Sequence, residues 1–144
     1  MKYTEQKQDL FTVSRDYTLA HCISTDCKMG AGIAKTFRDL YPKIPKVLLA
    51  LYPKIGQAVC YRTSSGQRIY HLITKRLYWE KPTYESLRAT LLDLKKQMVN
   101  RGEGKLAIPQ IGCGLDRLEW NQVSIMIQDI FQDTDIDILV CRLK

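Results

Sequence analysis

The chain has 144 residues, 45% of them hydrophobic, and carries a formal net charge of +7 at pH 7. This length suits one domain over residues 1–144, and the lack of a long apolar run or a signal-peptide core argues against a membrane partner. The positive charge favours an anionic partner, but it does not choose among nucleotides, nucleic acid and acidic protein segments.

The first half of the chain predicts a strand–helix unit that follows a short edge strand. The expected elements are an edge strand at 1–6, a buried strand at Leu19–Ser24, a helix from about Gly32 to Tyr41 and a short helix at Val47–Leu51. Asp9 puts an acid near the end of the first strand. Pro53 closes the short helix, because proline has no amide hydrogen to donate.

The second half predicts a hairpin, a long helix, and two strands around a further helix. The expected elements are hairpin strands at Gln57–Arg62 and Gln67–Thr74, a helix from Thr83 to about Gly102, a strand at Leu106–Ile108, a helix from Trp120 to about Ile130 and a last strand at Ile136–Arg142. Thr83 suits the N-cap of the long helix, and the apolar residues after it keep helical spacing.

This alternation of strands and helices predicts an α/β domain with helices on both faces of a largely parallel sheet. The hairpin makes the sheet mixed. In such sheets ligands lie outside the carboxyl ends of the strands, so Asp9, Lys75 and the loops after the strands would converge at one edge.

Two Gly-x-Gly turns each lead from a predicted strand toward a predicted helix. Gly30 and Gly32 form the first turn, and Gly112 and Gly114 form the second. Amides exposed at such turns suit phosphate, so the two could hold a pyrophosphate from both sides. The first turn lacks the third glycine of the dinucleotide fingerprint, because Lys35 stands there, and ordinary strand-to-helix turns are the alternative.

Lys75 and Asp116 each follow a predicted strand and could face each other across a pocket. A partly desolvated lysine is favoured as a neutral amine, which attacks carbonyl-like carbons such as C1 of a ribose, while a carboxylate moves the protons. The alternative is a surface lysine at a strand end. His21 and His71 are interpreted as hydrogen-bonded core histidines. Cys113 is interpreted as a small loop residue, although a nearby helix start could lower its pKa.

The cysteines favour a reduced, intracellular protein. They are five, an odd number, and no Cys-x-x-Cys pair occurs, so neither a zinc site nor a disulfide framework is expected. We expect no metal, no cofactor, a monomer, and a cytoplasmic location, with a nuclear one as the alternative in a eukaryote.

Five blocks together resemble the macrodomain family and, within it, the terminal ADP-ribose protein glycohydrolase subgroup. The blocks are His21–Ser24, Met29–Ala34, Leu72–Lys75, Lys81–Glu85 and Pro109–Trp120, in the same order and with similar spacing over almost the whole chain. The resemblance implies a three-layer α/β/α macrodomain with a mixed, largely parallel central sheet that binds ADP-ribose at the strand ends.

The resemblance also implies roles for individual residues. Those implied to bind ADP-ribose are Asp9, Leu10, Ser24, Met29, Gly30, Ala31, Gly32, Ile33, Gln110, Ile111, Gly112, Cys113, Gly114, Leu115 and Leu143. Asp9 would hold the adenine amino group, with Leu10 beside the base. Lys75 would attack the anomeric carbon of the distal ribose and form a lysyl–ADP-ribose intermediate, and Asp116 would act as the acid/base.

The implied substrates are ADP-ribose esters of glutamate and aspartate side chains on proteins, and O-acyl-ADP-ribose. Related macrodomains with a similar lysine act on ADP-ribosylated DNA bases, so ADP-ribosylated DNA is an alternative substrate. Further alternatives are a module that binds ADP-ribose without hydrolysing it, and a phosphatase of ADP-ribose-1″-phosphate. The presence of both Lys75 and Asp116 argues against a pure binding module.

Two positions depart from the family pattern. Macrodomains usually have glycine before the aspartate at the end of the first strand, and Gln8 precedes Asp9 here. The family often has an aromatic residue near the end of the last strand, where this chain has Cys141, with Leu143 beyond it. Adenine stacking would then be weaker, or an apolar side chain would supply it.

Overall fold

A six-stranded mixed sheet forms the centre of the fold in the computed structural model, which describes residues 1–143. The strands are β1 (Lys2–Lys7), β2 (Thr18–Ser24), β3 (Ala58–Arg62), β4 (Arg68–Lys75), β5 (Lys105–Ile108) and β6 (Asp137–Arg142). Their order is β1-β6-β5-β2-β4-β3, and only the β3–β4 pair is antiparallel. The carboxyl ends of the five parallel strands therefore meet at one edge.

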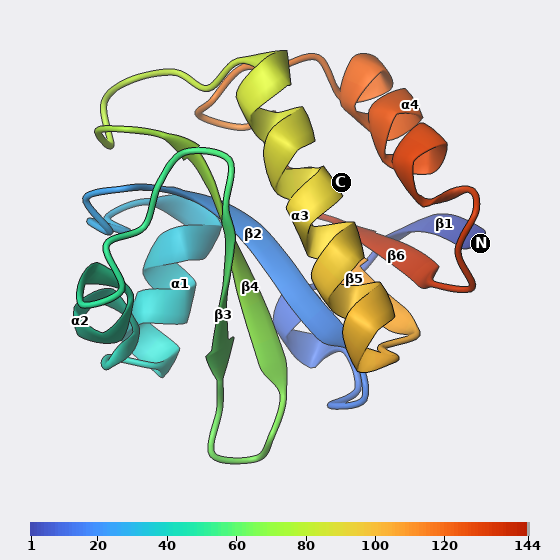
Figure 1. The fold of residues 1–144 in the computed structure, drawn as a ribbon, viewed down its shortest axis with the longest axis horizontal. Coiled ribbons are helices and arrows are strands. Elements are labelled where there is room, and N and C mark those ends of the chain that lie inside the picture. Colours follow the sequence, from blue (N-terminus) through green and yellow to red (C-terminus); the bar gives the residue numbers. More distant parts are fainter. Residues whose placement is uncertain (144) are drawn as a thin grey trace.

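Helices cover both faces of this sheet (Figure 1). They are α1 (Gly32–Leu40), α2 (Ile44–Leu49), α3 (Tyr84–Arg101) and α4 (Trp120–Phe131), with a 3₁₀ turn, η1, at Leu10–Thr12. One apolar cluster joins α3 and α4 to one face of the sheet, and a second joins α1, α2 and η1 to the other. The result is the expected three-layer α/β/α arrangement.

Local chemistry explains where the longest helix begins and ends. The Thr83 side chain accepts from the Ser86 amide at 2.9 Å, and the Ser86 hydroxyl accepts from the Thr83 amide at 3.0 Å. This reciprocal cap satisfies amides that a helix start leaves unpaired. Gly102 ends α3 in the left-handed region, at φ 69°, where glycine is tolerated without strain.

Most predicted elements agree with the structure to within one residue, but α2 does not. It was expected at Val47–Leu51, and the structure has it at Ile44–Leu49. The physical reason is Pro45, which lies in the first turn of α2. A proline there is compatible with a helix, because the first amides have no intrahelical acceptor, so α2 begins at Ile44 and includes Pro45.

The two core histidines differ from each other in their hydrogen bonding. His71 Nδ1 lies 3.1 Å from the Val59 carbonyl oxygen, as expected for a hydrogen-bonded core histidine. His21 does not meet that expectation, because neither of its ring nitrogens has a partner among residues 1–143. Its ring instead stacks on Phe37, with centroids 4.2 Å apart, and meets the edge of His71 at 4.7 Å. The His21 ring therefore packs against aromatic neighbours and forms no hydrogen bond with the described residues.

Burial lowers the pKa of both histidines, that of His71 to about 4, and the neighbouring His71 lowers the pKa of His21 further. Below pH 6.5 the unfolded chain therefore binds protons that the folded chain does not. Stability rises with pH wherever the unfolded state binds more protons, so it falls as the pH drops from 6.5 toward 4.

We predict that His21→Phe flattens this pH dependence, because phenylalanine keeps the stacked ring and removes one of the two titrations. The wild-type free energy of unfolding should fall by about 2 kcal/mol per buried histidine between pH 7.5 and 5. Urea unfolding followed by circular dichroism at several pH values measures the change. Parallel pH profiles for the variant and the wild type would contradict the prediction.

Candidate active site

A cleft of about 930 Å³ lies at the carboxyl ends of β2, β4 and β5. Both glycine turns line it, together with Lys75 from the last position of β4 and Asp116 from the β5–α4 loop. A smaller hollow of about 350 Å³ lies along β1 and contains neither turn. The two glycine turns, Lys75 and Asp116 therefore converge at one edge of the sheet in the folded chain.

The first turn leads into α1, and the amides at the start of this helix are open to the cleft. Ala31 is the N-cap in an extended conformation, and its methyl side chain offers no cap hydrogen bond. Gly32 follows at φ 58°, which glycine adopts readily. The amides at the start of a helix without a side-chain cap are available to an external acceptor, and the helix dipole favours an anion there.

The second turn depends on Gly112, which has φ 73°. A Cβ at this position would lie 3.0 Å from Leu118 Cδ1 and 3.4 Å from Leu87 Cδ2. The Leu118 amide closes the turn by donating to the Gly112 carbonyl oxygen at 2.7 Å. Gly114 differs, since nothing lies within 4 Å of the position of its Cβ.

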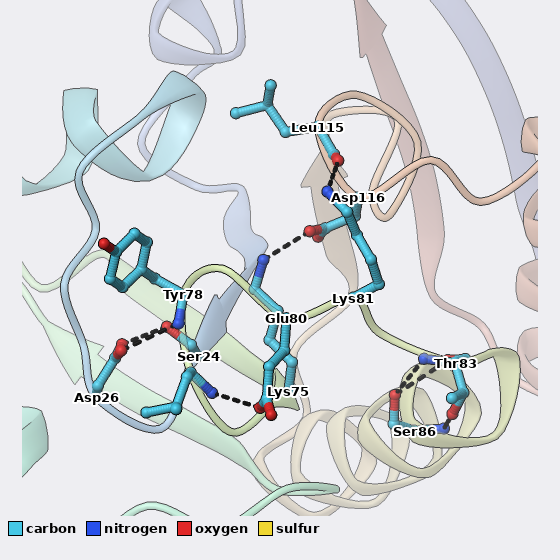
Figure 2. A network of polar contacts seen from close by, with 11 residues as sticks. Ser24, Asp26, Lys75, Tyr78, Glu80, Lys81, Thr83, Ser86, Leu115 and Asp116 are labelled. Atoms are coloured by element: carbon cyan, nitrogen blue, oxygen red, sulfur yellow. Dashed lines mark hydrogen bonds and ion pairs between the residues drawn. The ribbon is translucent and has the colours of Figure 1, made fainter.

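Lys75 and Asp116 form an ion pair across the cleft, with Lys75 Nζ 2.7 Å from Asp116 Oδ1 (Figure 2). Their side chains are 14% and 17% exposed. An amine is nucleophilic only when it is unprotonated, so the Lys75 ammonium must give up a proton before it attacks. The Asp116 carboxylate is the nearest base that could take it.

Most of the other predicted binding residues also line the cleft. They are Ser24, Met29, Gly30, Ala31, Gly32, Ile33, Gln110, Ile111, Gly112, Cys113, Gly114 and Leu115. Asp9, Leu10 and Leu143 do not line it. The Asp9 carboxylate accepts from the Phe11 amide at 2.9 Å and caps η1, Leu10 is buried in the core, and Leu143 is exposed.

Several residues line the cleft that the sequence did not single out as binding residues. They are His21, Cys22, Ile23, Lys28, Ala34, Arg38, Tyr78, Lys81 and Pro109. Lys28, Tyr78 and Lys81 lie in loops that follow parallel strands, and that position was the signal that could have found them. The strand residues gave no such signal, because an apolar run does not show which of its side chains face the cleft.

The cleft thiols are poor nucleophiles. Burial raises the pKa of Cys113 to about 11, and the nearby Asp116 and Glu119 carboxylates raise it further. Burial likewise raises the pKa of Cys22 above its ordinary value. The lowered pKa considered for Cys113 is therefore wrong, because desolvation and negative charge outweigh any helix effect. Among residues 1–143, no group of three His, Cys, Asp or Glu side chains could hold a metal ion.

Solved structures identify the class of fold. The macrodomain of Mycobacterium tuberculosis DarG is 23% identical, has a TM-score of 0.89, and is matched over 96% of each chain. Thermosipho africanus DarTG in complex with ADP-ribose is 21% identical with a TM-score of 0.88, over 98% of this chain and 41% of that one. The predicted fold class is confirmed: the architecture is that of a macrodomain.

Relatives in sequence define a narrower group of proteins than the fold does. The human ADP-ribose glycohydrolase OARD1 is 44% identical over 142 residues, which are 99% of this chain and 92% of that protein. The Bos taurus protein of the same name is 43% identical over 142 residues. No protein-family model matches the sequence. The chain belongs to the macrodomain family of ADP-ribose glycohydrolases, as the five sequence blocks predicted.

We predict that Gly112→Ala destabilises the protein by about 1–3 kcal/mol, because alanine is strained at positive φ and its Cβ presses on Leu118. Gly114→Ala, in open space two positions later, is the matched control and should change stability by less than about 0.5 kcal/mol. Thermal unfolding measures both. Equal losses for the two variants would show that the second turn does not depend on the Gly112 conformation.

Proposed function

We propose that this protein hydrolyses the ester bond between ADP-ribose and glutamate or aspartate side chains, and cleaves O-acyl-ADP-ribose. The Lys75–Asp116 ion pair between two glycine turns carries the proposal. The 44% identity to a human ADP-ribose glycohydrolase supports it. The modified partner would be an ADP-ribosylated protein.

ADP-ribose would bind with its pyrophosphate at the amides of the first turn and the start of α1. The second turn would enclose the distal ribose, whose anomeric carbon then faces Lys75. Asp9 and Leu10 are proposed to hold the adenine, beside the end of β6, where Gln8 donates to the Arg142 carbonyl oxygen at 2.9 Å. A cleft of about 930 Å³ is large enough for a ligand of this size.

The first chemical step would form a bond between Lys75 and the ribose. Asp116 takes one proton from the Lys75 ammonium, and the neutral amine attacks C1″. The C1″–O bond breaks, and its electron pair leaves with the carboxylate of the modified side chain. That carboxylate takes the second proton from the nitrogen, so the step leaves a glycosylamine on Lys75 and a protonated Asp116.

The second step would release ADP-ribose and restore the ion pair. Water adds its hydroxyl to C1″ as the C1″–N bond breaks, with the electron pair remaining on nitrogen. The nitrogen takes one proton from water and one from Asp116. Lys75 returns as an ammonium and Asp116 as a carboxylate, which is the charge state of the pair in the resting structure.

A binding module and a phosphatase are weaker candidates. A module that only holds ADP-ribose needs amide donors and an apolar wall, and gains nothing from a lysine paired with a carboxylate in the cleft. A phosphatase of ADP-ribose-1″-phosphate would release inorganic phosphate, which a colorimetric assay would detect.

We predict that Lys75→Arg binds ADP-ribose and loses turnover by more than about 1000-fold, because arginine keeps the charge but is not deprotonated in proteins. Asp116→Ala should slow turnover by about 10²–10⁴-fold and prolong the lysyl adduct. Titration calorimetry measures binding. The glycosylamine on Lys75 is in equilibrium with an open-chain imine, which borohydride reduces to a stable amine, and mass spectrometry then detects ADP-ribose on the peptide that contains Lys75.

An active Lys75→Arg variant would mean that water attacks directly and that Lys75 only steers the phosphates. Absence of any heat with millimolar ADP-ribose in the wild type would remove the whole proposal, catalytic or not.

ADP-ribosylated DNA is a second candidate substrate, supported by the surface next to Lys75. Tyr78 and Trp79 are 59% and 64% exposed, and Tyr78 lines the cleft. Lys28 and Lys81 also line it, and neither forms an ion pair with a carboxylate among residues 1–143. Exposed aromatic rings among cations stack on single-stranded bases and attract their phosphates.

We predict that Trp79→Ala lowers turnover of ADP-ribosylated single-stranded DNA about 5- to 10-fold more than turnover of a glutamate ester, because one stacked base is lost. Parallel assays of both substrates with wild type and variant measure the ratio. An equal effect on the two substrates would contradict a stacking role for Trp79.

A further inference from the structure

The loop that follows Lys75 is held on its β2 side by hydrogen bonds to two residues, Thr25 and Asp26. This segment, Arg76–Pro82, is called here the strap. The Thr25 hydroxyl donates to the Arg76 carbonyl oxygen at 2.6 Å. The Asp26 carboxylate accepts from the Tyr78 amide at 3.0 Å (Figure 2). Ser24 donates to the same Asp26 carboxylate. The strap is therefore attached to the end of the central strand.

The strap is also fixed internally and at its far end. The Glu80 carboxylate accepts from the Leu77 amide at 2.9 Å and from Arg76 at 3.4 Å. Immediately after the strap, Thr83 and Ser86 cap the start of α3. The strap thus has defined partners at its start and in its middle, and it continues directly into the capped start of α3. The main chain from which the Lys81 side chain extends is therefore held in place.

Segment 113–116, which carries Asp116, has few contacts of this kind. Lys75 donates to Asp116 at 2.7 Å, and Lys81 Nζ donates to the Leu115 carbonyl oxygen at 2.7 Å. Among the hydrogen bonds between residues 1–143, only these two reach the segment from outside its own loop. Leu115 itself is 67% exposed, so burial of its side chain does little to hold Asp116.

We propose that Lys81 is a positioning residue that holds Asp116 in place while Lys75 carries the ribose. The two contacts form a ring: Lys75 leads through the strap to Lys81, Lys81 binds Leu115, and Leu115 precedes Asp116, which binds Lys75. This inference rests on the proposed function. It assigns Lys81 no contact with the reacting atoms.

The role of Lys81 follows from the loss of the Lys75 charge in the first chemical step. When the Lys75 nitrogen bonds to C1″ it loses its positive charge, and the ion pair that held Asp116 is gone. The Lys81 contact is made to a main-chain carbonyl oxygen and does not depend on that charge. It is then the remaining contact from outside the loop, at the stage when Asp116 must donate its proton to the same nitrogen.

Lys81 also lines the cleft, so a direct contact with the pyrophosphate is the competing role. The two roles predict different defects when the Lys81 donor is removed. A phosphate ligand contributes to the affinity for ADP-ribose, whereas a residue that positions Asp116 affects the release step. Lys81→Met distinguishes them, since methionine keeps an unbranched apolar stem and removes the donor.

The test uses the full chain and a peptide that carries ADP-ribose esterified to a glutamate. We expect Lys81→Met to bind ADP-ribose within about threefold of wild type and to release it from Lys75 about 10- to 100-fold more slowly. Quenching with borohydride at set times, followed by mass spectrometry of the Lys75 peptide, measures the adduct lifetime. Lys81→Arg, which keeps a donor at similar reach, should restore much of the release rate.

Lys95→Met is the matched control. Lys95 also donates at 2.7 Å, to Asp133, and does not line the cleft. Its loss should leave the adduct lifetime unchanged. Equal unfolding temperatures for both methionine variants would show that the chain remains folded.

Two results would overturn the inference alone: an adduct that decays at the wild-type rate in Lys81→Met, or a loss of ADP-ribose affinity that matches the loss of turnover. A wild-type protein that shows neither turnover nor an adduct would overturn the proposed function, and this inference with it.

Discussion

The parallel pairing of β2 with β4 on one side and β5 on the other is the constraint on which the site depends. Parallel strands end at the same edge, so the loops after β2, β4 and β5 must lie side by side. These loops hold the first glycine turn, the strap, and the second turn with Asp116. Segments as distant in sequence as Gly30 and Asp116 therefore line one cleft.

The pairing also sets the position of the catalytic lysine proposed here. The β2–β4 register shifts by one residue after Ile23, so Ser24 lies opposite Lys75 and not Thr74. Irregularities of this kind re-aim a side chain where pairing ends. The Thr25 amide then donates to the Lys75 carbonyl oxygen at 3.0 Å, which fixes the backbone on which the ammonium is mounted. Main-chain hydrogen bonds thus orient Lys75, and Asp116 forms the ion pair with its ammonium group.

The sequence could predict the elements and both turns because each has a local cause. Thr83 and Gly102 bound the long helix through a side-chain cap and a left-handed residue, both readable from residue type. The same approach placed the start of α2 at Val47 and not at Ile44, because a proline such as Pro45 can break a helix or start one, and its neighbours in the fold decide which. It failed at His21 because a histidine in an apolar run does not disclose whether its nitrogens meet an acceptor or an aromatic ring.

By itself, the sequence determined the strand–helix alternation, the two glycine turns and the residues that resemble a macrodomain, since backbone propensity and hydrophobic period act over a few neighbouring positions. Only the tertiary structure decided that Lys75 and Asp116 meet at 2.7 Å, that burial raises the pKa of Cys113, and that Lys81 reaches Leu115. These contacts join residues far apart in the chain, and their distances depend on strand order and register. Strand order is set by which apolar faces bury one another, a choice made by the whole core and not by any single segment.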